Sequence, residues 1–495
     1  QAGVCLEKPT RSLSKRLNHS RYALGIAGTT AFAYLVTRER RYGERAKAEL
    51  MASLEADRWT NPEWKFNRGA DLLTAERSMA AALVFDWCHD LFEPGERKKV
   101  VAEVVRLGIA PYLMSIEGRK DWWVDNPVSN WCGVVHGGCG LAGLAFAPES
   151  QRAARAAESA GPYLRKFLRH VIQVDGGGHE GIMYWRYGVT FANTYLTAAA
   201  LLRGGIDGLF ATYTDKLAGY WDVYLHGPDH TYANFNNMNE HTFRGMAGLA
   251  PPHHSAGPSA VLAALFESFV PSGDPLLLWA ADHGGHAFYF QGGSPFYFLW
   301  RRDAPPVGPK PALQPNVLFR GAGHAILGSG DLWFVMNGGW TSNRSHNNKD
   351  LGSFVLVAQG ERFVHDPGYG FGATGNHSTL VFDGNSQPRD VAGRYLRFGE
   401  APGFAYAVCD LSETNPEQPL RHWIRHAVSV RGDYLVLFDE VELASPIDVE
   451  WRLQSRLPVS VDNPTRSARI RGETATLHVI PVQPRDARIT SRERT

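Results

Sequence analysis

Three stretches of this sequence combine amide, phenol, imidazole and carboxyl groups with glycines, and these are the residue types from which acid–base sites are built. The first stretch, residues 122–133, carries several tryptophans and Asn130 ahead of an apolar run. Asn130 either caps the helix predicted over residues 131–146 or presents its amide to a ligand flanked by indole rings. The residues alone leave both interpretations open.

The second stretch, residues 175–188, has four glycines within six residues. This density predicts an irregular loop between helices, which either exposes Tyr184 at the mouth of a cleft or forms a surface turn. No strand precedes it, so a nucleotide-binding glycine loop is excluded. Carboxylates in and near these two stretches also allow a glycoside hydrolase pair, drawn from Asp125, Asp175 and Glu180.

The third group of residues, 343–354, 365–370 and 375–379, contains three histidines besides several asparagines and aspartates. Imidazole and carboxylate groups beside short strands suit either acid–base chemistry or a metal. For any single histidine the alternative is an ordinary hydrogen-bonded loop residue. The asparagine-rich run 234–241 is expected either in a surface loop or in contact with substrate.

Composition narrows the class of protein. The 495 residues allow two or three domains, and 44% hydrophobic with 20% charged residues is typical of globular proteins. The net charge of +1 supplies no global field for nucleic acid or an anionic membrane. No apolar run reaches the about 20 residues that span a bilayer. The chain starts at Gln1 without Met, which predicts a mature periplasmic or secreted protein.

The elements expected around these stretches fall into two classes. Residues 20–290 show helical periodicity, with helices predicted at 22–37, 72–89, 96–114, 151–174 and 190–202. After a Pro-rich stretch at 304–311, short runs of β-branched and aromatic residues predict strands. We therefore expect a helical domain over 1–303, a linker over 304–315 and an antiparallel β-sandwich over 316–495. Five cysteines form no framework, and only Cys132 and Cys139 are candidates for a bridge.

Taken together, the stretches resemble the heparinase II/III-like polysaccharide lyases. The most specific part is the pattern His-x-x-x-Asp-x-Gly-x-Phe at residues 346–354, followed by Asp-Pro-Gly at 366–368. The Asn130 helix start and the Glu-Gly-x-x-Tyr segment at 180–184 precede it, in the order expected for this family. The resemblance covers nearly the whole chain and implies an incomplete (α/α) toroid followed by an antiparallel β-sandwich.

The resemblance also implies roles for single residues. Asn130 would neutralise a substrate carboxylate, Tyr184 would be the catalytic tyrosine, and His346 would be its partner from the β domain. Some members bind zinc there, and Asp366 and His377 match two ligand positions, while Asn348 stands at the third. The resemblance therefore leaves open whether a structural zinc or calcium ion is bound. The chemistry itself needs no cofactor. The candidate substrate contacts are Trp123, Trp131, Arg186, His241, Arg244 and Tyr369.

The predicted function is β-elimination in a 4-linked uronic acid polysaccharide, which makes the partner an anionic polysaccharide or oligosaccharide. A glycosaminoglycan (heparan sulfate or heparin, hyaluronan, chondroitin) is preferred over alginate because of the Asn130 and His346 pattern. Two other functions compete with it. One is the glycoside hydrolase described above, and the other is a carbohydrate-binding or structural protein that keeps the fold without catalysis.

Overall fold

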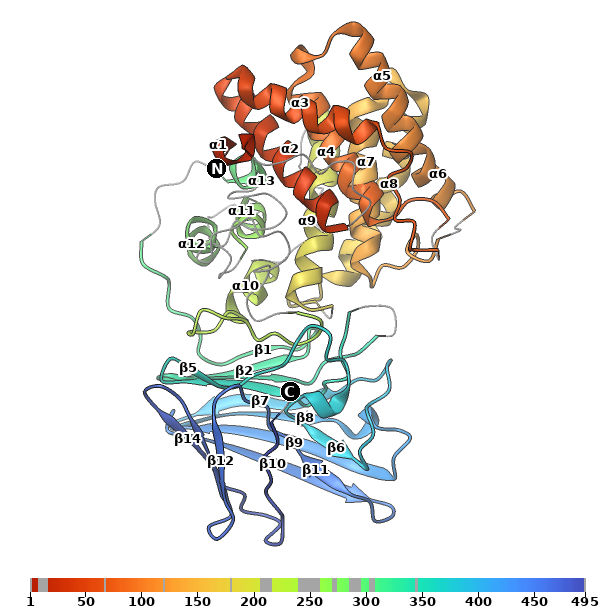
Figure 1. The fold of residues 1–495 in the computed structure, drawn as a ribbon. Coiled ribbons are helices and arrows are strands. Elements are labelled where there is room, and N and C mark those ends of the chain that lie inside the picture. Colours follow the sequence, from red (N-terminus) through yellow and green to blue (C-terminus); the bar gives the residue numbers. More distant parts are fainter. Residues whose placement is uncertain are drawn as a thin grey trace. The chain divides into compact units, whose positions relative to one another are not determined.

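The computed structural model describes residues 2–7, 17–65, 68–118, 121–178, 180–204, 216–238, 259–268, 274–284, 295–301, 308–342 and 346–493. The chain divides into two compact units. The first consists of residues 1–223 and 241–311, and the second of residues 224–240 and 312–495. The first unit is built from helices and the second from antiparallel strands (Figure 1).

The helical unit contains the predicted helices with shifts of up to five residues at their ends, except that the helix predicted over 190–202 begins eight residues earlier, at Ile182. Residues 94–116 form one helical rod, interrupted by a π-helical stretch at Val105–Ile109. The α-helices are α1 (Ala2–Leu6), α2 (Leu17–Thr37), α3 (Arg40–Leu54), α4 (Leu72–Trp87), α5 (Pro94–Val104), α6 (Ala110–Ile116), α7 (Asn130–Phe146), α8 (Gln151–Val171), α9 (Ile182–Leu202), α10 (Lys216–Tyr224), α11 (Ala260–Ser268), α12 (Pro275–His283) and α13 (Pro295–Trp300).

Local sequence explains where these helices begin. Asp71 caps α4, because its side chain accepts the Thr74 N–H at 3.1 Å while the Thr74 hydroxyl accepts the Asp71 N–H. Pro94 occupies the first turn of α5, where its missing N–H costs nothing. Ser150 caps α8 by accepting the Ala153 N–H. The starts of α4 and α8 thus use side chains that satisfy exposed N–H groups.

Two glycines allow α7 and α9 to approach closely. A β-carbon on Gly133 would lie 2.7 Å from the Gly188 carbonyl oxygen, and one on Gly188 would lie 3.2 Å from Cα of Asn130. Any larger residue at these positions would push the helices apart. The first turn of α7, with Asn130, is therefore held against α9 by backbone packing.

The β unit consists of antiparallel sheets. The sheet orders are β1-β2-β3-β4-β5, β10-β9-β8-β7, β11-β6 and β12-β13-β14. The strands are β1 (Val317–Phe319), β2 (His324–Ser329), β3 (Leu332–Asn337), β4 (Phe354–Ala358), β5 (Glu361–Val364), β6 (Leu380–Phe382), β7 (Arg394–Ala401), β8 (Phe404–Asp410), β9 (Leu420–Val430), β10 (Tyr434–Leu443), β11 (Val449–Trp451), β12 (Val459–Asp462), β13 (Ser467–Arg471) and β14 (Thr476–Val479).

A single apolar core joins the two larger sheets. Phe334 on β3 and Phe354 on β4 belong to the same buried cluster as Ala407 on β8 and Trp423 on β9. Alternate residues of β9 are buried, as expected for strands with one face on a core. The predicted fold class, an incomplete (α/α) toroid followed by an antiparallel β-sandwich, is confirmed.

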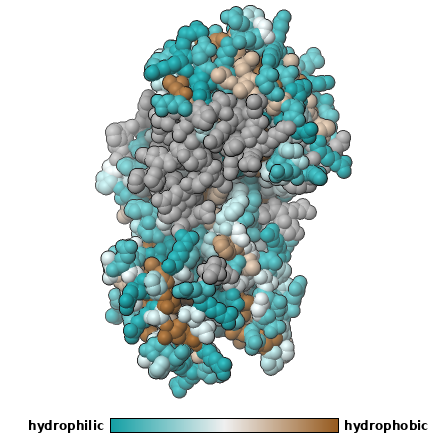
Figure 2. All heavy atoms as spheres, in the orientation of Figure 1, coloured by the Kyte–Doolittle hydropathy of each residue, from teal (hydrophilic) through white to brown (hydrophobic). Residues whose placement is uncertain are grey.

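Most of the described surface in Figure 2 is hydrophilic, and apolar residues reach the surface of the β unit in patches. Phe404, Tyr434 and Phe438 are among the exposed side chains of the four-stranded sheet. Among the described helices, none combines the length and apolar character needed to cross a bilayer. The five cysteines are buried and free, so the candidate bridge between Cys132 and Cys139 is not formed.

One segment departs from the predicted domain boundaries. Residues 224–240 precede the Pro-rich stretch, yet they pack with the β unit. They fold back through a bridge between His226 and Tyr232. Asp229 forms a paired salt bridge with Arg362 on β5, with N–O distances of 2.8 and 3.2 Å. This segment brings the asparagine-rich run onto the β unit.

Candidate functional site

In the helical unit, Asn130 is held by Glu180. The Glu180 carboxylate accepts the backbone N–H of Asn130 at 2.7 Å and its side-chain Nδ2 at 2.8 Å. Both side chains are completely buried. The amide oxygen of Asn130 is buried without a hydrogen-bond partner in the described part of the chain. Glu180 therefore fixes which way the amide points.

The helix cap is Ser129 and not Asn130. The Ser129 hydroxyl accepts the Trp131 N–H, while Asn130 is the first residue of α7. The interpretation of Asn130 as an ordinary cap is therefore wrong, because its side chain is bonded to Glu180 and not to the helix N–H groups. A capping serine one residue earlier was the signal that could have separated these two possibilities.

The residues around Tyr184 are helical, which corrects the predicted loop. The glycine-rich segment ends at Gly181, whose φ of 82° is left-handed, and α9 begins at Ile182. Tyr184 lies in the first turn of α9 and is largely buried. Arg186 is also buried, and its Nε lies 3.0 Å from Asp222 Oδ2. The guanidinium that was expected to meet substrate thus forms an internal ion pair.

The two predicted tryptophan contacts take different positions. Trp123 is fully buried, and its Nε1 donates to the Ala70 carbonyl at 3.1 Å, so it does not fit the predicted stacking on a sugar. Trp131 packs between Trp64 and Trp122, with ring centroids 5.0 and 5.3 Å apart. Trp122 is 42% exposed. In this cluster Trp122 offers the open indole face, which the sequence did not distinguish from its neighbour.

His346 belongs to the β unit and is partly buried. Burial and the charge of Arg389 lower the pKa of His346 to about 4. The imidazole is therefore neutral at pH 7, the state in which it accepts a proton. Its backbone carbonyl accepts the Asn237 N–H at 3.0 Å.

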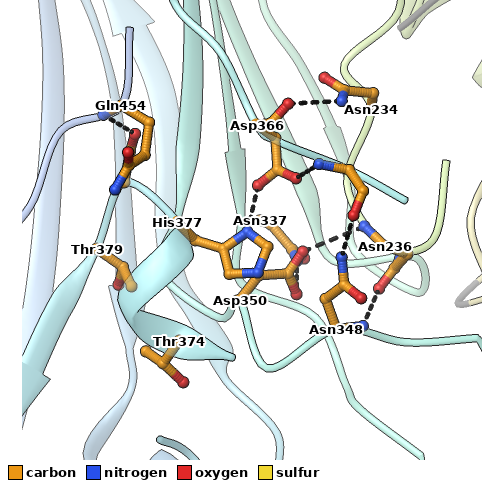
Figure 3. Close-up of polar contacts among 12 residues, drawn as sticks. Asn234, Asn236, Asn337, Asn348, Asp350, Asp366, Thr374, His377, Thr379 and Gln454 are labelled. Carbon is orange, nitrogen blue, oxygen red and sulfur yellow. Dashed lines mark hydrogen bonds and ion pairs between the residues drawn. The ribbon is translucent and has the colours of Figure 1, made fainter. Parts of the chain in front are cut away.

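Two predicted metal ligands lie together in the β unit, and a third group joins them. His377 Nδ1 lies 2.6 Å from Asp366 Oδ2, and both side chains are buried. Figure 3 shows Asp350 beside this pair. One ligand atom from each of Asp350, Asp366 and His377 lies within 4.8 Å of the other two.

A proton on His377 balances part of the negative charge of Asp350 and Asp366. Burial lowers the pKa of His377, but the charge and hydrogen bond of Asp366 and the charge of Asp350 outweigh burial and raise it to about 9. Protonated His377 then offsets part of the negative charge of the two carboxylates. Burial in turn raises the pKa of Asp350 despite the charge of His377.

The donor set fits a divalent cation. Two carboxylates and one imidazole are ligands that zinc accepts. Nε2 of His377 is buried and makes no hydrogen bond that meets the usual geometry among the described residues. Asn348, at the third expected position, donates Nδ2 to the Gly368 carbonyl at 3.3 Å. Asp350 therefore takes the place in the cluster that the sequence assigned to residue 348.

The asparagine-rich run contributes residues that sequence reasoning missed. Asn234 and Asn236 are buried and bonded to the loops around Asp350 and Asp366 (Figure 3), so these two asparagines lie neither in a surface loop nor in the open. Tyr369 is 46% exposed in the following loop. The predicted contacts His241 and Arg244 lie outside the described residues.

Comparison with known proteins supports the fold. No protein-family model and no curated protein matches the chain. Solved structures do match. A heparinase III structure superposes with a TM-score of 0.64 at 16% identity, covering 94% of this chain and 70% of that one. The chain shares the fold of heparinase III.

Two further structures agree with this result. Heparan sulfate lyase HepC from Pedobacter heparinus gives a TM-score of 0.57 at 14% identity, covering 91% of this chain and 67% of its own. A Paenibacillus xanthan lyase gives a TM-score of 0.51 at 12% identity, covering 92% of this chain and 47% of the lyase chain. The resemblance seen in the sequence is therefore confirmed at the level of the fold.

Proposed function

We propose that this protein is a polysaccharide lyase that cleaves 4-linked uronic acid units by β-elimination. The observation that carries the proposal is the Asn130–Glu180 pair, which fixes a buried amide against the helix whose first turn bears Tyr184. The fold shared with heparinase III supports it. The ends of the products would be 4,5-unsaturated uronates.

The chemistry explains why an amide and a phenol suit this reaction. Removing the C5 proton of a uronate builds a second negative charge next to its carboxylate. A fixed N–H donor stabilises that charge by about 3–4 kcal/mol, as in an oxyanion hole. Nδ2 of Asn130 has two hydrogens, and the bond to Glu180 uses one of them. The second is the donor that we assign to the substrate carboxylate.

Tyr184 is the proposed proton carrier. An ordinary tyrosine is only about a thousandth ionised at pH 7, so a phenolate base needs a nearby positive charge. Arg186 was a candidate for that charge, but Asp222 neutralises it. Tyr184 therefore suits the acid role, in which it protonates the C4 leaving oxygen. We propose His346, neutral at pH 7, as the base for substrates whose C5 proton lies on the opposite face.

Access to the amide constrains the proposal. The Asn130 side chain is fully covered in this structure. A substrate carboxylate reaches Nδ2 only when covering side chains move. Trp122, exposed beside Trp131, is the proposed stacking surface for a sugar ring at the entrance.

For the substrate we propose a glycosaminoglycan of the heparan sulfate, hyaluronan or chondroitin class. The names of the heparinase III and heparan sulfate lyase structures support this choice. Alginate remains the alternative uronate polymer. We also infer a periplasmic or secreted location, since such polymers are met outside the cytoplasm.

The hydrolase alternative has less support. Glu180 is buried and spends both carboxylate oxygens on Asn130. Asp125 is paired with Lys166 at 2.6 Å. A hydrolase needs two carboxyl groups facing one glycosidic bond, and these two carboxylates are already engaged in structural contacts.

A divalent cation, if bound, would be held by Asp350, Asp366 and His377 and would link loops of the β unit. We propose a structural role for it. The amide of Asn130 and the phenol of Tyr184 belong to the helical unit and supply the charge stabilisation and proton transfer described above.

Product analysis tests the proposal. The purified protein is incubated with a panel of uronic polysaccharides, and ultraviolet absorbance reports an unsaturated uronate. Tyr184→Phe should lower kcat by at least about 10²-fold while KM stays within a few-fold. Tyr195→Phe, three turns further along α9, is the matched control, because its hydroxyl donates to the Ala157 carbonyl. Products that incorporate solvent oxygen and lack the absorbance would instead indicate a hydrolase.

A further inference from the structure

We propose that Asn236 is the positioning residue for His346: its amide fixes the turn from which the imidazole projects. The kinetic part of this inference rests on the proposed lyase function. The structural part concerns only the β unit, to which residues 224–240 and His346 both belong.

The contacts of Asn236 converge on the turn at residues 346–350. Its Oδ1 accepts the Asn348 N–H at 3.1 Å and the Asn347 Nδ2 at 3.2 Å. Its own N–H donates to Asp350 Oδ2 at 3.2 Å. The next residue, Asn237, donates its N–H to the His346 carbonyl at 3.0 Å. Residues 236 and 237 therefore bind four of the five residues 346–350.

No sheet ladder shapes this turn. Strand β3 ends at Asn337 and β4 begins at Phe354, so residues 346–350 lie in the connection between them. Their backbone direction is therefore set by contacts such as those with Asn236. A residue held in this way moves when the holding group is removed, and displacement of a reacting group by about 1 Å can cost about 10²-fold in rate.

The residue type at position 236 is specific. Its φ of 71° is left-handed, a conformation that asparagine tolerates better than other residues with a side chain. Glycine would keep the backbone but supply no acceptor for the Asn347 and Asn348 donors. Aspartate would keep an acceptor but add a negative charge close to Asp350. Asparagine, unlike glycine and aspartate, combines tolerance of a left-handed φ with an uncharged acceptor.

The test compares Asn236→Gly with His230→Gly. His230 lies in the same segment, is exposed and has a similar φ of 59°, so its replacement controls for glycine at a left-handed position. Three readouts are measured: the imidazole NMR signal of His346 in histidine-labelled protein, identified by its loss in His346→Gln; the melting temperature; and kcat and KM on the substrate found above.

For Asn236→Gly we expect a shifted or broadened His346 signal and a fall in kcat of about 10–100-fold with KM within about threefold. His230→Gly should change none of these. If Asn236→Gly does not fold, Asn347→Ala removes one of the two donors to Asn236 and should shift the His346 signal in the same way. An unchanged signal in the folded variant, with kcat within twofold of the parent, overturns the positioning role. If no variant shows lyase activity, the proposed function fails, and the NMR signal still decides this inference.

Discussion

Replacing Asn130 with aspartate tests the Asn130–Glu180 pair directly. The change keeps the side-chain size but places a carboxylate oxygen where Nδ2 now lies 2.8 Å from Glu180 Oε1. Both side chains are completely buried, so water does not separate them. Two like charges about 3 Å apart repel by about 5–6 kcal/mol at an effective dielectric constant of about 20.

Proton uptake limits this cost. An ordinary carboxyl group titrates near pH 4 and each pH unit is worth about 1.4 kcal/mol, so protonating one member of the pair costs about 4 kcal/mol at pH 7 and about 1.4 kcal/mol at pH 5. We expect Asn130→Asp to lose about 4 kcal/mol of unfolding free energy at pH 7 and about 1–2 kcal/mol at pH 5. With about 2.1 cal/mol/K of unfolding entropy per residue, the corresponding fall in Tm at pH 7 is about 4–7 °C.

Urea unfolding at the two pH values measures this difference against the parent protein. The exchange Asn130→Asp with Glu180→Gln is the internal control, because it restores one amide and one carboxylate and should recover most of the loss. A helix cap would tolerate aspartate within about 1 kcal/mol. Two results would refute the Asn130–Glu180 pair. One is Asn130→Asp alone losing no more than about 1 kcal/mol at pH 7, and the other is a double exchange that recovers none of the loss. Because Asn130→Asp is expected to destabilise the fold, its loss of activity reports on catalysis only when it is compared with the exchange variant.

Three further results are expected. Burial lowers the pKa of His136 to about 4, so the unfolded chain binds the proton first as pH falls; moving from pH 7 to 5 should cost about 2 kcal/mol in urea unfolding, and His136→Gln should remove that part of the slope. His377→Ala and chelation should each lower the Tm more than the initial rate at mild temperature; an unchanged Tm together with elemental analysis that finds no metal would remove the cation. Arg425 is fully buried and pairs with Asp439 through two bonds of 2.8 Å, so Arg425→Met should cost at least about 3 kcal/mol, and a loss below about 1 kcal/mol would contradict this.

Periodicity and composition predicted the fold well, because the spacing of apolar residues along a helix or strand follows directly from which of its faces is buried. The order of helices before strands and the starts at Leu72 and Gln151 agree with the structure. Glycines misled the prediction between Asp175 and Gly188. Gly188 serves close helix packing and not a loop, and sequence composition does not distinguish these two uses of glycine.

Pairings between distant residues were the main limit for the candidate site. Nothing local to Arg186 announces Asp222, and Trp123 reads like Trp122 until burial separates them. The grouping of Asp366 with His377 was predicted, but Asp350 joined them only through the fold. The asparagine-rich run was expected in a surface loop or against substrate, because asparagine is usually exposed unless its amide is bonded. In the structure, Oδ1 of Asn236 accepts hydrogen bonds from residues 347 and 348.

The segment at residues 224–238 has a consequence for how this gene can be recombined. It is encoded before the last helices of the toroid, yet it completes the β unit. A crossover at the Pro-rich stretch would therefore deliver a β-sandwich from one parent and its buried asparagines from another. Chimeras of related enzymes should fold reliably only when Asn234 and Asn236 travel with the loops that they bind. Inheritance of the two units is thus linked even though each has its own core.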